Sequence, residues 1–299
     1  MSDQSHPIRV VLVCCITHFK DKNDYFGSSE GMKYKIIFLD IDGTLTDSRK
    51  LITEKTRKAL MNAAEKGLII AIASGRPEPG LAYAAGELEL SDIGGYLLPF
   101  NGGLIKDALT GEVIASNTIS RVALETAYMT AKEFDIGVIT YKNGDIIAAD
   151  RTDEYIELES RINGMPVKIT DNFFEEIDFS PVKCLLTGEP SLAEKAEKRL
   201  AELLSGKANV FRSEPFFVEV VPNGIDKAES IKTLIGRLGI SRDEVIACGD
   251  GFNDVSMISY AGLGVCMSNG CDAAKAAADY IAPSNDEDGI ADVIEKFVL

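Results

Sequence analysis

The pattern of hydrophobic and polar positions divides the chain into two similar ends and a different middle. Near the N-terminal end, a short apolar run at 35–39 precedes a helical pattern at 53–66, and a second run at 68–73 precedes a helix at 81–88. Near the C-terminus we expect a helix at 225–238, a strand at 245–248, a helix at 254–261 and a strand at 264–267. Buried strands that alternate with helices predict an α/β fold, a doubly wound parallel sheet to which both ends contribute.

The middle of the chain, residues 119–222, shows another pattern. Here we expect helices at 120–134, 152–162 and 191–204, a strand at 182–186 and two strands at 209–212 and 216–221. Two further strands flank Asn143-Gly144, and this dipeptide between alternating apolar runs is typical of a β-hairpin. The sequence therefore predicts a core domain from residues 32–118 and 223–299, with residues 119–222 inserted as a separate α+β domain that carries an antiparallel sheet.

The first 31 residues show no clear period, whereas Met32 leads directly into the first apolar strand. We hypothesise that Met32 is the natural translation start and that residues 1–31 are an upstream extension of the reading frame. The alternative is a loosely attached N-terminal strand.

The charge balance narrows the class of partner. The chain of 299 residues has 31 basic and 47 acidic side chains, a formal net charge of −16. This field disfavours nucleic acid as a partner, and any phosphate site must supply its own positive charge from a cation, a Lys or Arg, or helix N-termini. Six cysteines without CxxC spacing indicate reduced thiols and a cytoplasmic protein, and the early apolar run at 10–16 is too short to span a membrane.

Two carboxylates stand at the end of the first predicted strand. Asp40 and Asp42 occur in Asp40-Ile41-Asp42-Gly43-Thr44. Buried acids are costly unless they bind a metal or hydrogen-bond donors, and ligands of parallel sheets bind beyond the carboxyl ends of the strands. The backbone amides of Ile41, Gly43 and Thr44 are placed to wrap an anion there. An acidic turn that caps the next helix is the alternative interpretation.

Another acidic segment follows the predicted strand at 245–248. Asp250 lies at the same edge of the sheet and completes an oxygen-rich site for Mg²⁺, with Asp254 one turn away on the next helix. Alone, the segment also fits a Gly-Asp turn with a helix cap.

Other polar residues become candidate phosphate or substrate contacts because they occur together with these acidic segments. Ser74 ends the second strand and offers a hydroxyl to a phosphate, with the amide of Gly75 beside it and Arg76 at the rim. Lys227, at the start of a predicted helix, has an unfavourable sign for the helix dipole but the right sign for a phosphate. Asn101 follows the apolar run at 97–100 and either lines the cleft or belongs to a plain turn.

These segments resemble the four motifs of the haloacid dehalogenase superfamily, and the insert resembles the class IIB cap of Cof-type phosphatases, over residues 32–299. The resemblance implies that Asp40 is the nucleophile, Asp42 the general acid/base and Mg²⁺ the cofactor. It further implies phosphate contacts from Ser74, Lys227 and Asn253, and metal coordination by Asp40, Asp42, Asp250 and Asp254. Ala228 and Ser268 depart from the family's pattern, because Gly is common at both positions; neither change removes a reacting group.

The resemblance implies a phosphatase of small phosphorylated metabolites, such as sugar phosphates, that forms an aspartyl-phosphate on Asp40. Asp42 would act first as a neutral acid and then as a base. A phosphomutase shares this chemistry and stays an alternative. Alternatives from another class are a receiver-type module, which needs neither a second acid/base nor a long insert, and a non-catalytic phosphate-binding scaffold. The sequence leaves the oligomeric state open.

Overall fold

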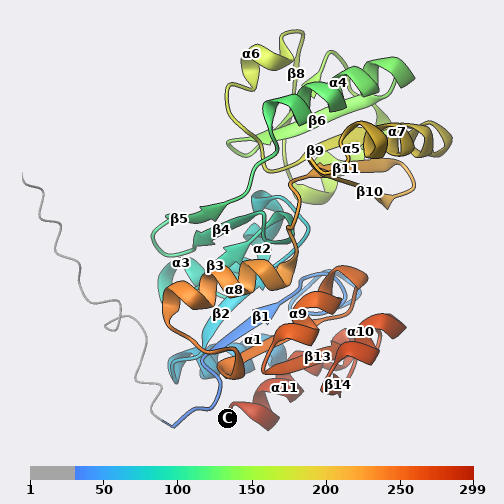
Figure 1. Ribbon diagram of the computed structural model, residues 1–299. Helices are drawn as coiled ribbons and strands as arrows, with labels where there is room; N and C mark the ends of the chain where they lie inside the picture. Colours follow the sequence, from blue (N-terminus) through green and yellow to red (C-terminus); the bar gives the residue numbers. More distant parts are fainter. Residues whose placement is uncertain (1–30) are drawn as a thin grey trace, which may run out of the picture.

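The computed structural model describes residues 31–299 and contains two separate β-sheets (Figure 1). The hypothesis about residues 1–31 concerns residues that, apart from Gly31, lie outside the described part of the chain. The first sheet has eight strands in the order β14-β13-β12-β1-β2-β3-β4-β5. Its strands are β1 (Ile36–Leu39), β2 (Ile69–Ala73), β3 (Tyr96–Leu98), β4 (Leu104–Asp107), β5 (Val113–Ser116), β12 (Val245–Gly249), β13 (Leu263–Met267) and β14 (Tyr280–Ala282).

Both ends of the chain build this sheet, as predicted, and β1 lies between β2 and β12 in parallel register. All pairs from β14 to β3 are parallel, whereas β4 and β5 form an antiparallel edge that the sequence reasoning did not include. Side chains of β1 alternate between two cores: Ile37 and Leu39 face one, Ile36 and Phe38 the other. This burial on both faces explains why the strand is apolar throughout.

Helices cover both faces of the eight-stranded sheet. Leu60 of α1 and Ile290 of α11 contribute to one core, and Leu234 of α8 and Met257 of α9 contribute to the other. The helices of this part are α1 (Glu54–Glu65), α2 (Ala82–Glu87), α3 (Leu90–Ile93), α8 (Lys227–Leu238), α9 (Val255–Tyr260), α10 (Asp272–Ala277) and α11 (Gly289–Phe297). The architecture is the predicted doubly wound α/β fold.

The insert forms a second sheet of six strands in the order β10-β11-β9-β6-β7-β8. Its elements are α4 (Arg121–Phe134), β6 (Gly137–Lys142), β7 (Asp145–Ala149), α5 (Glu154–Asn163), β8 (Val167–Thr170), α6 (Phe173–Glu176), β9 (Cys184–Thr187), α7 (Pro190–Leu203), β10 (Asn209–Glu214) and β11 (Phe217–Val221). Asn143 and Gly144 both have positive φ, at 52° and 88°, as a tight hairpin turn requires. The sheet is antiparallel except for β8, which the sequence did not predict and which pairs with β7 in parallel.

The two predicted helices next to the site begin one or two residues later than expected. The helix expected from 225 begins at Lys227, because the side chain of Asp226 accepts the backbone N–H of Glu229 and so caps the helix. The helix expected from Asp254 begins at Val255, because Phe252–Asp254 forms a 3₁₀ turn. In both cases an acidic residue before the helix is engaged in local hydrogen bonds.

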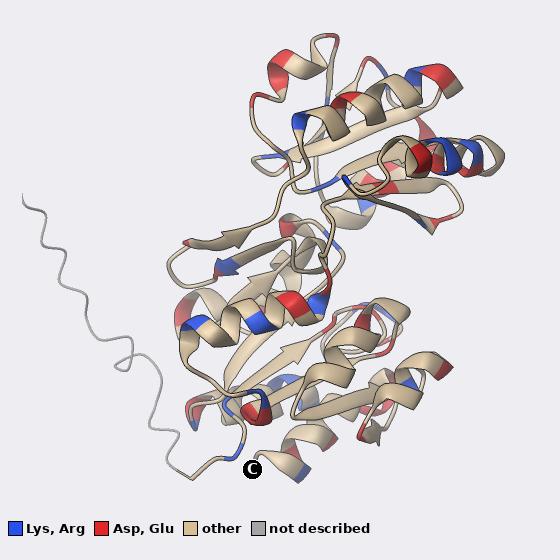
Figure 2. Cartoon of the chain, in the orientation of Figure 1, with Lys and Arg blue, Asp and Glu red and all other residues tan. Residues whose placement is uncertain are grey.

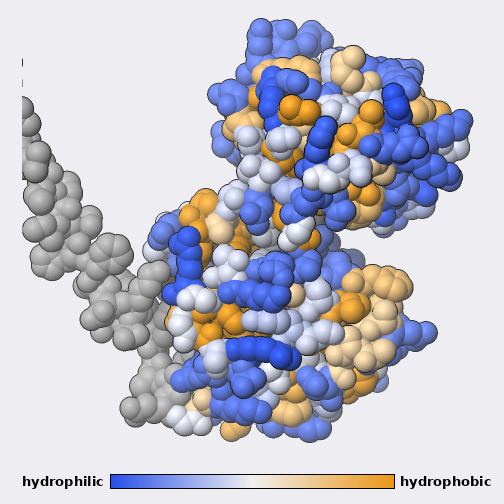
Figure 3. Space-filling model, in the orientation of Figure 1, coloured by the Kyte–Doolittle hydropathy of each residue, from blue (hydrophilic) through white to orange (hydrophobic). Residues whose placement is uncertain are grey.

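The space-filling view shows a hollow between the part built on the eight-stranded sheet and the insert (Figure 3). Lys and Arg lie scattered among Asp and Glu on helices of both parts (Figure 2). The exclusion of nucleic acid stays a prediction from net charge. Within residues 31–299, no helix has the length and apolar character needed to cross a membrane. The four described cysteines, at 184, 248, 266 and 271, are free thiols, as the sequence predicted for them.

Candidate active site

Three neighbouring strands of the eight-stranded sheet end in the residues that the sequence singled out. Asp40 follows β1, Ser74 follows β2 and Asp250 follows β12. Because these strands are adjacent and parallel, their carboxyl ends meet at one edge of the sheet. The backbone N–H of Asp40 donates to the carbonyl of Cys248 at 3.0 Å, which ties the end of β1 to β12.

A cluster of three carboxylates lies at this edge. One oxygen each of Asp40, Asp250 and Asp254 lies within 4.8 Å of the others. The ammonium of Lys227, fully buried, donates to Asp40 Oδ1 and to Asp254 Oδ1, each at 2.6 Å. The structure therefore brings together four of the predicted site residues, and it places Lys227 as the local positive charge that the net charge of the chain demands.

The electrostatics of this cluster are those of crowded, buried charge. Burial raises the pKa of Asp40 to about 7; Lys227 opposes this shift, and the charges of Asp254 and Asp250 add to it. Burial also raises the pKa of Asp250. For Lys227, burial favours the neutral form, but the charges of Asp40 and Asp254 outweigh it and raise the pKa. Without a further cation, the cluster carries excess negative charge.

Asp254 has a second task. Its other oxygen accepts the backbone N–H groups of Asp250 and Gly251, at 3.0 and 2.8 Å. A Cβ atom at Gly249 would lie 2.4 Å from the Cβ of Asp254, so only glycine allows this close approach. Asp254 thus holds the loop that carries Asp250, in addition to facing Lys227.

The carboxylate of Asp42 lies apart from the cluster of three. Arg76 donates to both of its oxygens, at 2.7 and 2.8 Å, and Lys50 donates to one at 2.8 Å. Burial favours the neutral acid, but the hydrogen bonds and charges of Arg76 and Lys50 outweigh it and lower the pKa of Asp42. These contacts favour the ionised form of Asp42, whereas its predicted role in the first step needs the neutral acid. Its predicted role as a metal ligand stays a prediction.

The loop after Asp40 packs directly against Asp250. The hydroxyl of Thr44 donates to Asp250 Oδ1 at 2.9 Å. Gly43 has φ +81°, and a Cβ there would lie 2.4 Å from Asp250 Oδ2. The backbone N–H of Thr46 donates to the carbonyl of Ile41 at 3.0 Å, which closes the loop. Phosphate binding by the amides of Ile41, Gly43 and Thr44 stays a prediction.

The other predicted phosphate contacts, Ser74, Gly75 and Asn253, all lie against Asn101. The backbone N–H of Asn101 donates to the carbonyl of buried Ser74 at 2.8 Å. Asn253 donates to the side-chain oxygen of Asn101 at 3.1 Å, and a Cβ at Gly75 would lie 3.3 Å from that oxygen. Asn101 has φ +55°, in the left-handed region that asparagine adopts more readily than most residues, and its predicted place in the cleft stays a prediction. Asn101 therefore links the loops after β2 and β12.

The three carboxylates fit a divalent cation of the Mg²⁺ type. Carboxylate oxygens are the donors that Mg²⁺ prefers, and it commonly takes only one or two of them with water and substrate oxygens. When ionised, three carboxylates and one ammonium sum to a charge of −2, which one divalent ion offsets.

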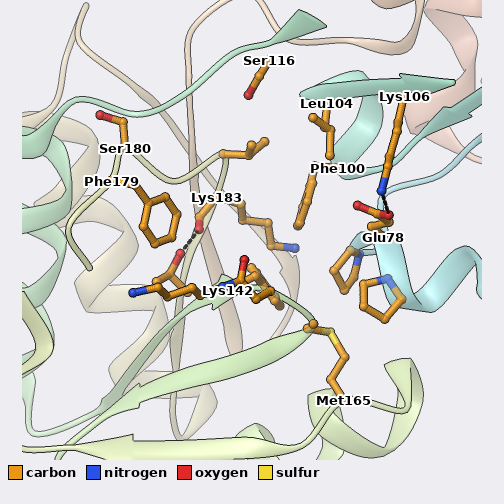
Figure 4. A pocket seen from close by; sticks show the side chains of 17 residues that line it. Glu78, Phe100, Leu104, Lys106, Ser116, Lys142, Met165, Phe179, Ser180 and Lys183 are labelled. Carbon is orange, nitrogen blue, oxygen red and sulfur yellow. Dashed lines mark hydrogen bonds and ion pairs between the residues drawn. The ribbon is translucent and has the colours of Figure 1, made fainter. Parts of the chain in front are cut away.

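A cavity of about 580 Å³ lies between the two sheets (Figure 4). Phe100 and Lys106 line it from the eight-stranded part, and Lys142 and Lys183 from the insert. The rings of Phe100 and Tyr141 lie 5.4 Å apart across the two parts. Asp40, Lys227 and Asp250 do not line this cavity, although Pro77 and Phe100 of its wall stand next to the loops that carry Ser74 and Asn101.

Sequence reasoning missed three residues near the site. Lys50 reaches Asp42 from a loop with no local signal of function. Asn269 and Asn285 follow β13 and β14 and donate to the carbonyls of Gly43 and Thr46, at 2.8 and 2.9 Å. The strand-end rule that selected Asp250 would have selected both asparagines if it had been applied to the last two strands.

Comparison with known proteins agrees with this geometry. Residues 37–294 match the model of the haloacid dehalogenase-like hydrolases. The match covers most of the chain, including both sheets and the carboxylate cluster. The chain belongs to this family.

Particular relatives narrow the activity. The chain is 30% identical, over 90% of its length and 98% of the relative, to a 5-amino-6-(5-phospho-D-ribitylamino)uracil phosphatase of Bacillus subtilis. A haloacid dehalogenase-like hydrolase from Bacteroides thetaiotaomicron is 42% identical, with a TM-score of 0.85 over 88% of this chain and 99% of that one. The subclass IIB sugar phosphatase BT4131 is 27% identical, with a TM-score of 0.74 over 88% and 98% of the two chains. The protein is a phosphatase, a phosphoric monoester hydrolase.

Proposed function

We propose that this chain is a Mg²⁺-dependent phosphatase of small phosphorylated metabolites, with sugar phosphates or similar polyol phosphates as the substrate class. The observation that carries the proposal is the cluster of Asp40, Asp250 and Asp254 with Lys227 buried among them. Two similar proteins support the substrate class, because one is named for a phosphoribityl compound and the other for sugar phosphates.

In the first step an oxygen of Asp40 attacks phosphorus, and the bond between phosphorus and the ester oxygen breaks. The leaving alkoxide takes a proton from Asp42, so the products are an aspartyl-phosphate and a free alcohol. Lys227 and the loop amides stabilise the charge on the transferring phosphoryl group. When bound, Mg²⁺ supplies further positive charge to the phosphoryl oxygens, held by Asp40, Asp250 and Asp254.

In the second step water attacks the phosphoryl group, and Asp42 accepts the proton that the water loses. The bond between phosphorus and the Asp40 oxygen breaks, which releases inorganic phosphate and restores the carboxylate. Asp42 must gain a proton before the first step, although Arg76 and Lys50 hold it ionised. A substrate phosphate dianion attracts these same cations, and its charge favours the protonated form of Asp42.

The division into a core of residues 32–118 and 223–299 and a cap of residues 119–222 is part of the proposal. The hollow between the two parts and the contact of Arg76 with the carbonyl of Ile162, at 3.4 Å, support a cap that closes over the core. In this account, side chains of the cap read the leaving group.

A screen of phosphate esters with Mg²⁺ tests the proposal. Hexose and pentose phosphates, pyridoxal phosphate, flavin mononucleotide and nucleotides are each incubated with the wild type and with Asp40→Asn, and inorganic phosphate is measured. We expect phosphate release from polyol or sugar phosphates by the wild type alone. Isomerised sugar phosphate without free phosphate would identify a phosphomutase instead, and release from nucleotides alone would overturn the substrate class.

A further inference from the structure

The loop that follows the nucleophile is fastened by the last two strands of the sheet, which lie beyond the strands that carry the reacting groups. β13 and β14 are second and third from β1 on the β12 side of the sheet. Asn269 stands two residues after β13, and Asn285 stands three residues after β14. Both side chains reach back across the carboxyl edge to the loop of residues 41–46.

The contacts form one continuous chain. Asn269 Nδ2 donates to the carbonyl of Gly43 at 2.8 Å, and Asn269 Oδ1 accepts the backbone N–H of Asn285 at 3.0 Å. Asn285 Nδ2 then donates to the carbonyl of Thr46 at 2.9 Å. The two ends of the Asn269 amide are fixed by these partners, because a carbonyl only accepts and a backbone N–H only donates.

The position of these bonds decides what they control. Gly43 has φ +81°, a conformation that few other residues adopt. Because glycine is conformationally free, the peptide group between Gly43 and Thr44 can rotate unless a hydrogen bond fixes it. In a planar peptide the carbonyl and the following N–H point in opposite directions. A bond to the carbonyl of Gly43 therefore also sets the direction of the Thr44 amide, which donates to the carbonyl of Ile41 at 3.5 Å, and Asp250 packs closely against Gly43.

The same C-terminal segment continues along the chain that leads into α1. Asp286 accepts the backbone N–H of Ser48 at 2.7 Å, and Asp288 accepts the hydroxyl of Thr53, the residue that caps α1. The segment that follows the loop of residues 41–46 is therefore held in place as well. Within this C-terminal segment, Asn269 and Asn285 are the residues that contact the loop itself.

From this network we propose that Asn269 and Asn285 are positioning residues for catalysis. They hold the backbone of residues 43–46, and through it Asp42 and the loop amides, in the arrangement that phosphoryl transfer requires. This inference rests on the proposed function, since it assigns the loop amides to the substrate phosphate.

The test compares Asn269→Ala, Asn285→Ala and the double variant with wild type, with Asn62→Ala as a matched control. Asn62 is an exposed asparagine of α1 outside this network. With p-nitrophenyl phosphate and Mg²⁺, we expect each single variant to lower kcat by roughly tenfold, because small displacements of reacting groups have large effects on rate. KM should change less than threefold, and Asn62→Ala should match the wild type.

Two further readouts separate positioning from packing. The double variant should lose about as much as the worse single variant, because both residues act on one loop in series. Asn269→Asp keeps the shape and the acceptor for Asn285 but lacks the donor to Gly43, so it should lose at least as much kcat as Asn269→Ala. A packing role predicts that Asn269→Asp stays near wild type.

Failure of the positioning role and failure of the proposed function give different results. If Asp40→Asn is inactive while Asn269→Ala and Asn285→Ala both keep kcat within twofold of wild type, the phosphatase assignment stands and the positioning role is overturned. If Asp40→Asn is fully active, the proposed function fails first. Additive losses in the double variant also overturn the positioning role, because they mean that the residues act independently.

Discussion

The ammonium of Lys227 lies 2.6 Å from an oxygen of Asp40, although 187 positions separate the two residues in the sequence. It lies equally close to Asp254. This buried ion pair joins the start of α8, just after the insert, to the strand end that carries Asp40, the proposed nucleophile. Lys227 therefore contacts Asp40 and Asp254 although the whole insert separates it from Asp40 in the sequence.

Among the described residues, Lys227 is the one positive charge inside the cluster of Asp40, Asp250 and Asp254, and replacement by methionine removes it. We expect kcat with p-nitrophenyl phosphate to fall by roughly a hundredfold or more, as for the loss of one preorganised donor to a transition state. Lys232→Met, at a half-exposed lysine of the same helix, is the control and should leave kcat unchanged. Equal activity of both variants would contradict the role of Lys227.

The pKa of Asp40 predicts how stability changes with pH. Because its folded-state pKa is raised to about 7, the native state binds more protons than the unfolded state between about pH 4 and 7. The stabilisation is present at low pH and is lost as the pH rises through about 7. Without metal, the unfolding temperature should therefore be higher near pH 6 than near pH 8, and less so in Asp40→Asn. If the metal-free wild type instead unfolds at a higher temperature near pH 8 than near pH 6, and Asp40→Asn does not, the predicted direction of the pH dependence is wrong.

Added Mg²⁺ should counteract the fall in unfolding temperature between pH 6 and pH 8. Metal binding requires ionised carboxylates and releases protons, so the rise in unfolding temperature on adding Mg²⁺ should be larger at pH 8 than at pH 6. Asp250→Asn removes one carboxylate and should reduce that rise. Thermal unfolding with Mg²⁺ or with a chelator measures it, and an equal Mg²⁺ effect in both proteins would exclude Asp250 from the metal site.

The leaving group should reveal the role of Asp42. Asp42→Asn should lower kcat/KM for an alkyl phosphate by about a hundredfold or more, because the alkoxide then lacks its proton donor. The loss should be smaller for p-nitrophenyl phosphate, whose leaving group needs no proton. Equal losses for both esters would show that Asp42 acts on something other than the leaving group.

The insert contains a buried ion pair that tests its stability. Lys183 Nζ lies 2.9 Å from Glu219 Oε1, and the two side chains are 6% and 10% exposed. Lys183→Met leaves a buried carboxylate unpaired and should destabilise the protein by about 3–5 kcal/mol, whereas Lys183→Met with Glu219→Leu should recover most of the loss. Denaturant unfolding distinguishes the two variants, and equal stability would contradict the pairing.

Sequence patterns predicted the parallel sheet and the polar residues at its carboxyl edge because both are encoded locally. Buried parallel strands are continuous apolar runs, and Asp40, Ser74 and Asp250 stand at the ends of such runs. The edge strands β5 and β8 escaped because their side chains are half exposed, which leaves no clear apolar run. Local pattern carries information about burial, and few side chains of these two strands are buried.

Pairings across the site lie beyond the sequence for another reason. The ionised state of Asp42 depends on Arg76 and Lys50, which approach it from two loops, and no spacing rule places a lysine eight positions after a carboxylate. Likewise, the contacts of Asn269 and Asn285 depend on the lateral order of β12, β13 and β14. Such contacts follow from the assembled sheet alone.

We infer that Asp40 carries the phosphoryl group during turnover. The most direct measurement is rapid acid quenching of the enzyme during hydrolysis of a phosphate ester with Mg²⁺, followed by mass analysis of the peptide that contains Asp40. We expect one transient phosphoryl group on Asp40 in the wild type and none in Asp40→Asn, which should also lose turnover by roughly a thousandfold or more. A phosphoryl group on another residue, or wild-type turnover by Asp40→Asn, would contradict it.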